Sequence, residues 1–149
     1  MLEYDIWWQV YPLGALGAPL RGDHGEPAHR LRRLEAWLDY VVELGCNGLL
    51  LNPIFASVSH GYDTLDHYRI DPRLGDDADF DHLIAQCGAR GLGVVLDGVF
   101  NHVARSHPLV TERPDLIAMD GDRPAGGRAT TTSSSSTTPT PPWPTSSST

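Results

Sequence analysis

Side chains that can bind a ligand gather at two places in this sequence. The first is residues 60–63 (His-Gly-Tyr-Asp), and the second is residues 97–102 (Asp-Gly-Val-Phe-Asn-His). Each place follows a short apolar run, and the first of these runs is closed by Asn52. Carboxylates, amides, imidazoles and phenols all form hydrogen bonds, so the two places together could hold a small molecule. This requires a fold that brings both to one edge.

Three apolar runs predict β-strands. Residues 6–11 are rich in Trp and Val and end at a proline, and residues 48–53 form an unbroken apolar run that also ends at a proline. Residues 94–96 (Val-Val-Leu) lead directly into Asp97. Unbroken apolar runs of this length are typical of strands that are covered on both faces in a parallel sheet.

Two helices are predicted between these strands. Apolar residues repeat at three and four positions in the first, with Gly45 placed as its left-handed stop. Its apolar stripe is Leu31, Leu34, Leu38, Val41 and Val42. In the second helix, Asp77 is the predicted N-cap, and Gly91 ends the helix. Its inward stripe is Phe80, Leu83, Ile84 and Cys87.

The succession strand, helix, strand, helix, strand predicts an α/β fold with right-handed parallel crossovers. In such folds, ligands bind at the carboxyl ends of the strands, where the connecting loops gather. Asn52, residues 60–63 and residues 97–102 all fall at those ends. The sequence therefore predicts one site made from two separate segments.

Charge and composition narrow the function. The 149 residues carry 11 Lys and Arg against 19 Asp and Glu, a net charge of −8 that disfavours nucleic acid or an anionic membrane as the partner. A membrane span and a secretory signal are not recognisable, so we expect a cytoplasmic protein. Cys46 and Cys87 lack a Cys-x-x-Cys spacing and are predicted to be buried free thiols.

The sequence divides near residue 120. Residues 1–120 contain the apolar clusters, whereas residues 121–149 are rich in Ser, Thr and Pro and are predicted to be disordered. Our interpretation of this second region is an out-of-frame or aberrant end, and the alternative is a glycosylated stalk. The nucleotide sequence across these codons would decide between them.

Other polar residues receive structural interpretations. Five histidines lack a metal-ligand spacing and are predicted to have surface or capping roles: His24, His29, His67, His82 and His107. Four aspartates lack the calcium-loop signature and are interpreted as the solvated first turn of the second helix: Asp76, Asp77, Asp79 and Asp81.

These segments resemble the opening of the α-amylase superfamily, glycoside hydrolase family 13. Residues 7–12 (Trp-Trp-Gln-Val-Tyr-Pro) resemble its first strand, residues 48–53 its second, and residues 60–68 the segment that follows. The most specific match is residues 97–102, which fit the family's Asp-x-x-x-Asn-His signature. The resemblance implies a partial (β/α)8 TIM barrel, namely its first three βα units, in residues 1–120.

The resemblance also implies roles for single residues. Tyr62 would stack on a sugar ring, since an aromatic face matches the C–H face of a pyranose, and Asp63 would accept hydrogen bonds beside it. Asp97 would orient a catalytic arginine, and His102 would donate to a sugar hydroxyl. Asn101 matches a calcium-binding position, the one cofactor contact that the family suggests. Judged without the family, Tyr62 could be a half-buried core residue, Asp63 a turn former and Asp97 a simple strand-end carboxylate.

The catalytic acids of the family are not recognisable here. A retaining glycosidase needs two carboxyl groups about 5 Å apart, and no Gly-Phe-Arg-x-Asp type motif follows His102. We therefore predict a fragment of a glycosidase that hydrolyses or transfers at α-glucosidic bonds of maltooligosaccharides or starch-like glucans. Alone, it should be inactive. Its open strand edges should favour association, and the alternative is that the isolated chain remains a loose globule.

Two other functions remain open at this stage. The chain could be a non-catalytic α-glucan-binding or scaffold protein, or it could be complemented by a second chain that carries the later strands. The oligomeric state is left open.

Overall fold

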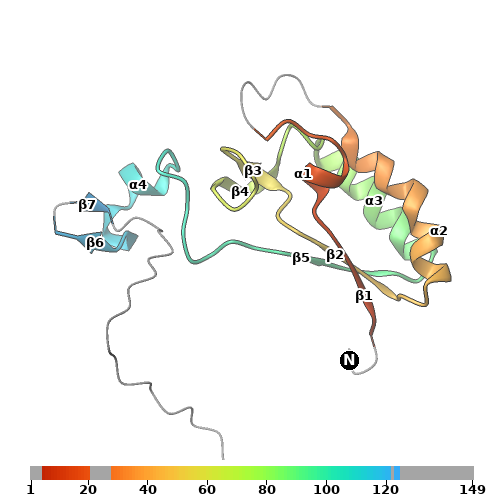
Figure 1. Cartoon of the computed structure of the whole chain (residues 1–149). Helices are drawn as coiled ribbons and strands as arrows, with labels where there is room; N and C mark the ends of the chain where they lie inside the picture. Colours follow the sequence, from red (N-terminus) through yellow and green to blue (C-terminus); the bar gives the residue numbers. More distant parts are fainter. Residues whose placement is uncertain (1–4, 21–27, 122, 125–149) are drawn as a thin grey trace, which may run out of the picture.

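The computed structural model describes residues 5–20, 28–121 and 123–124. Its centre is a three-stranded parallel sheet in the order β1-β2-β5 (Figure 1). The strands are β1 (Trp7–Val10), β2 (Gly48–Leu51) and β5 (Gly93–Leu96), so the three predicted strands and their parallel direction are confirmed. Each of β1 and β5 pairs with β2 alone within the described residues.

Two helical segments connect these strands and lie side by side (Figure 1). A 3₁₀ turn, η1 (Arg30–Leu34), leads into α2 (Glu35–Glu43), and α3 (Asp77–Ala89) follows β2. Both glycine stops are confirmed, because Gly45 has a φ of 81° and Gly91 a φ of 70°, which residues with a Cβ rarely adopt.

The core lies between these helices and one face of the sheet. Leu49 and Leu51 alternate with outward residues of β2 and are fully buried, and the helices add a matching stripe. That helix stripe is Leu31, Leu34, Leu38, Val41, Leu83 and Cys87. The predicted stripes were each one residue too wide, since Val42 and Ile84 are exposed. Each follows a buried residue and is rotated about 100° away from it around the helix axis.

An antiparallel hairpin follows β2 and was not predicted. Its strands are β3 (Phe55–Ser57) and β4 (Thr64–Ile70), with register shifts between them. Most side chains of β4 are polar, so the segment lacks the apolar run that indicates a strand. The loop between the two strands carries Tyr62 and Asp63.

A buried ion pair anchors this hairpin. The Arg73 side chain is fully buried and binds both carboxylate oxygens of Asp71, at 2.8 Å and 2.6 Å. Arg73 also donates to Oγ of Ser57 at 2.7 Å, to the carbonyl of Ser59, and to the carbonyl of Pro19 beyond the short helix α1 (Pro12–Ala15). Nothing in the local sequence pattern had indicated this contact.

The remaining described elements are short. They are α4 (Leu109–Glu112), η2 (Pro114–Leu116), and the paired strands β6 (Met119–Asp120) and β7 (Arg123–Pro124). The β6–β7 pair crosses the predicted boundary at residue 120, and the rest of the predicted disordered region lies outside the described residues. Among the described residues, no helix has the length and apolar character needed to cross a membrane.

Both cysteines are free, as predicted, with Cys87 buried and Cys46 half-buried. His107 is buried rather than on the surface, and its Nδ1 accepts from Leu109 N at the start of α4, which is a capping role. His29 is exposed, and His24 lies outside the described residues.

Candidate functional site

The carboxyl ends of β2 and β5 place Asn52 and Asp97 beside each other. The parallel ladder continues one residue beyond each strand, because Asn52 N donates to Val10 O at 2.9 Å and Asp97 N donates to Leu51 O at 2.8 Å. Adjacent strands in register send side chains of the same row to the same face. Accordingly, Asn52 Nδ2 lies 3.5 Å from Asp97 Oδ2, on the face away from the helices.

Tyr62 reaches this pair from the hairpin loop. Its hydroxyl donates to Asp97 Oδ2 at 2.9 Å and accepts from Asn52 Nδ2 at 2.5 Å. The loop itself is held by Tyr11, whose hydroxyl donates to His60 O at 3.0 Å. The two predicted segments therefore meet, and Tyr62 and Asp97 are in direct contact.

Partial burial raises the pKa of Tyr62 above its ordinary value of 10.0. The Asp97 carboxylate adds to this increase, while the hydrogen bond from Asn52 opposes it. A phenol is protonated at neutral pH even at its ordinary pKa, and a carboxylate can only accept, so Tyr62 is the donor toward Asp97.

Asp63 is used within its own loop. Its carboxylate accepts from Ser59 N at 3.0 Å and from Ser59 Oγ at 2.6 Å. Burial opposes ionisation of Asp63, but the hydrogen bonds from Ser59 and the nearby His60 outweigh burial and lower its pKa. This is the turn-forming role that the residue type allows, and contact of Asp63 with a ligand stays a prediction.

His102 forms a hydrogen bond with the backbone of Tyr62. Its Nε2 lies 2.8 Å from Tyr62 O, and a carbonyl can only accept, so Nε2 carries a proton. In the neutral ring, Nδ1 is then an acceptor. With this hydrogen bond intact, a neutral His102 would accept from a sugar hydroxyl through Nδ1 rather than donate to it.

An open cavity of about 390 Å³ lies over this cluster. Six residues line it: Tyr62, Asp97, Gly98, Val99, Phe100 and Asn101. The ring of Phe100 is 85% exposed and folds back over Gly98, where a Cβ would collide with it. The cavity thus combines one carboxylate, one phenol and one exposed aromatic ring, which suits a ligand with both polar and apolar faces.

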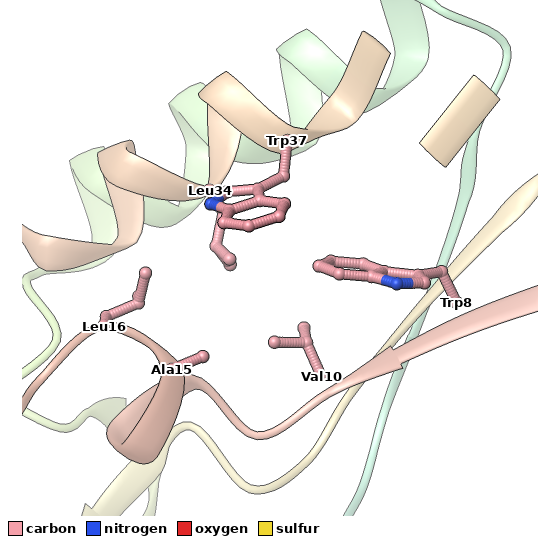
Figure 2. Close-up of a pocket in the computed structure, with 6 residues that line it drawn as sticks. All are labelled: Trp8, Val10, Ala15, Leu16, Leu34 and Trp37. Atoms are coloured by element: carbon pink, nitrogen blue, oxygen red, sulfur yellow. The ribbon is translucent and has the colours of Figure 1, made fainter. Parts of the chain in front are cut away.

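A second cleft, of about 130 Å³, is almost entirely apolar. Figure 2 shows the rings of Trp8 and Trp37 facing each other across it, with centroids 6.2 Å apart and planes inclined by 20°. Val10, Ala15, Leu16 and Leu34 form the rest of its wall. It holds no titratable side chain and therefore offers no acid–base chemistry.

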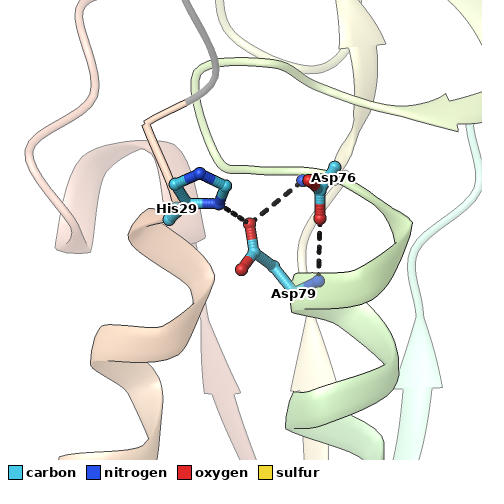
Figure 3. Close-up of side chains that lie close together, drawn as sticks. All are labelled: His29, Asp76 and Asp79. Atoms are coloured by element: carbon cyan, nitrogen blue, oxygen red, sulfur yellow. Dashed lines mark hydrogen bonds and ion pairs between the residues drawn. The ribbon is translucent and has the colours of Figure 1, made fainter.

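One group of three possible metal ligands occurs in the described part of the chain, formed by His29, Asp76 and Asp79 (Figure 3). Asp79 is fully buried, and its oxygens accept from Arg32 Nε at 2.5 Å and lie 2.6 Å from His29 Nδ1. Because an arginine already neutralises this carboxylate, the cluster is explained as an ion-paired helix start.

The N-cap prediction and the solvated-turn interpretation are corrected here. Asp76, not Asp77, caps α3: its side chain accepts from Asp79 N at 2.9 Å, while the Asp79 carboxylate accepts from Asp76 N at 3.2 Å. This reciprocal pair is a capping box. Asp76, Asp77 and Asp81 are exposed as expected, but Asp79 points inward to Arg32.

Asn101 is exposed at the rim of the larger cavity and does not belong to the three-ligand group. Its predicted contact with calcium stays a prediction.

The sequence placed Asn52 at a strand end but did not reveal its contacts, and it gave no role to Gln9. Gln9 Nε2 donates to Asn52 Oδ1 at 3.0 Å. The available signal was Gln9 itself, a polar residue within a strand that is otherwise apolar.

A model of the α-amylase catalytic domain matches residues 30–119. The chain belongs to the α-amylase family. It is 49% identical over 72 residues to an intracellular maltogenic amylase of Bacillus subtilis, a match that covers 48% of this chain and 12% of that enzyme.

Solved structures of α-amylase family enzymes resemble this chain in fold and sequence. Amy13B of Eubacterium rectale superposes with a TM-score of 0.55 at 35% identity, covering 68% of this chain and 19% of that one. The ligand-free cyclic α-maltosyl-(1→6)-maltose hydrolase of Arthrobacter globiformis gives 0.58 at 32% identity, with 74% and 29% covered. The chain therefore spans less than a third of each of these relatives.

Proposed function

We propose that this chain contributes part of the substrate site of an enzyme that hydrolyses or transfers at α-glucosidic bonds of maltooligosaccharides or starch-like glucans. One observation carries the proposal: Tyr62 and Asp97, from segments 35 residues apart, share a hydrogen bond at the wall of the cavity at the strand ends. The names of the relatives, a maltogenic amylase and a hydrolase of a cyclic maltosyl-maltose, indicate the same substrate class.

The fold that we propose is the first three βα units of a (β/α)8 barrel. Strands β1, β2 and β5 would line its interior with the face that carries Asn52 and Asp97, and α2 and α3 would lie outside. In such barrels, the site is at the carboxyl ends of the strands, which is where Tyr62 and His102 gather.

The described cavity supports binding rather than bond cleavage. A retaining mechanism needs a nucleophile and an acid, two carboxyl groups about 5 Å apart. Asp97 is the one carboxylate that lines the cavity in the described residues. We therefore propose that the 149-residue chain, tested by itself, binds glucan without hydrolysing it and that the cleaving carboxylates come from elsewhere in the complete enzyme.

Calorimetry with maltoheptaose, combined with chromatography of the sugar after long incubation, tests this function. We expect saturable heat, no shorter sugars, and a loss of the heat in Tyr62→Ala. Tyr68→Ala is the matched control, because Tyr68 is 96% exposed and lies on β4, away from the cavity lining. Saturable heat that survives Tyr62→Ala would contradict the proposed site, and hydrolysis would contradict the division of roles.

The same assay separates a binding or scaffold protein from an enzyme part. Adding a chain that carries the later segment of a relative should restore hydrolysis if the residues described here belong to a catalytic site. Glucan binding without restored hydrolysis would favour the non-catalytic alternative.

A further inference from the structure

We propose that Asn52 is the positioning residue of this site and that Gln9 sets the orientation of its amide. This inference rests on the proposed function, but its first test, a titration of Tyr62, does not require that the chain binds glucan. Asn52 contacts all three polar partners of the cluster: it accepts from Gln9 and donates toward Tyr62 and Asp97.

The hydrogen bonds determine which way the amide faces. The Asp97 carboxylate can only accept, so the atom of Asn52 that faces it and the Tyr62 hydroxyl must be the amide nitrogen. The amide oxygen then faces Gln9, whose Nε2 donates to it at 3.0 Å and holds this orientation. A flipped amide would set its nitrogen against the nitrogen of Gln9 and its oxygen against a carboxylate, two repulsive contacts in place of two attractive ones.

The amide in turn directs the phenol hydrogen. The Tyr62 oxygen accepts a hydrogen bond from Asn52 Nδ2 through one of its own lone pairs. The hydroxyl hydrogen of Tyr62 then points toward Asp97. Among the described residues, no Arg, Lys or His forms an ion pair with Asp97. The neutral donors Tyr62 and Asn52 therefore hold this carboxylate at the cavity wall.

Strand geometry explains why these residue types occur here. Gln9 lies in the same row as Leu50 and Val95, and Asn52 follows Leu50 by two residues on the same face. The side chain of Gln9 is long enough to bridge these rows. An asparagine at residue 52 is short enough to remain between Tyr62 and Asp97.

The test uses the pKa of Tyr62, followed by the ultraviolet absorbance of its phenolate and assigned by difference from Tyr62→Phe. In Asn52→Ala, the donor that stabilises the phenolate is lost while Asp97 remains, so we expect the Tyr62 pKa to rise further. Asn52→Asp should raise it more, because a second carboxylate then faces the phenol. A merely structural role predicts the opposite, since a loosened loop exposes Tyr62 and returns its pKa toward 10.0.

Gln9→Ala provides a second variant, because it releases the amide without changing Asn52. We expect the same direction and a smaller increase in the Tyr62 pKa. Gln86→Ala is the control that should leave the Tyr62 pKa unchanged, since Gln86 lies on α3 and contacts Arg90. An unchanged or lower Tyr62 pKa in both Asn52→Ala and Gln9→Ala, with circular dichroism showing a folded chain, would overturn the inference.

Glucan binding is the second readout. Asn52→Ala should weaken maltoheptaose binding about 3- to 10-fold, the effect expected if a displaced Tyr62 or Asp97 loses one hydrogen bond to the sugar. If the unchanged chain binds no maltoheptaose, the proposed function fails, while the titration still decides the role of Asn52. If the chain binds and Asn52→Ala binds equally well, the proposed function stands and the positioning role fails.

Discussion

The indole ring of Trp7 lies directly against Gly48 on the neighbouring strand. Register places Trp7, Gly48 and Gly93 in one row across β1, β2 and β5. A Cβ on Gly48 would overlap the ring, and a Cβ on Gly93 would lie 3.6 Å from its far edge. Two glycines thus leave room for one large side chain on the face of the sheet that carries the candidate site.

Gly48→Ala should destabilise the chain by about 1–3 kcal/mol, because the new methyl group must push the Trp7 ring aside. Gly88→Ala is the matched control of opposite sign: Gly88 lies within α3 with no atom near a built Cβ, so alanine should stabilise the helix by up to about 1 kcal/mol. Urea unfolding of both variants measures the difference. Equal effects would show that Trp7 moves freely.

Arg73→Met should lower the free energy of unfolding by about 3–5 kcal/mol, or abolish cooperative unfolding. The substitution leaves the buried Asp71 carboxylate without its cation. Arg90→Met is the control, because its partner Asp39 is 77% exposed and water screens such a surface pair, so its loss should change stability little. A similar small loss in both variants would mean that water reaches Asp71.

Asp76→Ala should cost about 1 kcal/mol of stability, the usual effect of removing an N-cap side chain. The adjacent Asp77→Ala should cost only a few tenths of a kcal/mol, since Asp77 contributes through the helix dipole alone. Thermal or urea unfolding can rank the two variants. The reverse order would return the cap to Asp77.

The free energy of unfolding should fall as the solution becomes mildly acidic, partly through His107. Burial, and then His67, hold the pKa of His107 below its ordinary value of 6.5, although Asp66 and Glu112 oppose this shift. The unfolded chain therefore binds a proton before the folded chain does, and stability is lost from about pH 6.5 downward until the folded pKa is reached.

The geometry of His107 explains the direction of this effect. Its Nδ1 accepts from Leu109 N at 3.0 Å, and its Nε2 is buried without a partner among the described residues. Because Nδ1 accepts, the proton of the neutral ring is on Nε2. A second proton would go to Nδ1, break the hydrogen bond from Leu109 N and leave the charge in a buried ring. Urea unfolding at a series of pH values should give a shallower slope in His107→Phe, and an unchanged slope would show that His107 titrates freely.

Local periodicity determined the parallel sheet and the two helical segments that cover it, but not the hairpin of β3 and β4. The three parallel strands, the two helical segments and the two glycine stops were all recognisable, because burial of one face and the left-handed region of a glycine are properties of neighbouring residues. The grouping of polar residues at strand ends also followed, since parallel strands bring their carboxyl ends together.

Tertiary structure decided what each polar side chain does. Asp79 forms an ion pair with Arg32, 47 residues away, and Asn52 is held by Gln9, 43 residues away. The hydrogen bond of His102 to the Tyr62 carbonyl spans 40 residues. Such partners leave no periodic trace in the sequence, because each depends on how the segments pack. The sequence therefore indicated where the candidate site lies, and long-range hydrogen bonds assigned the donors and acceptors of its side chains.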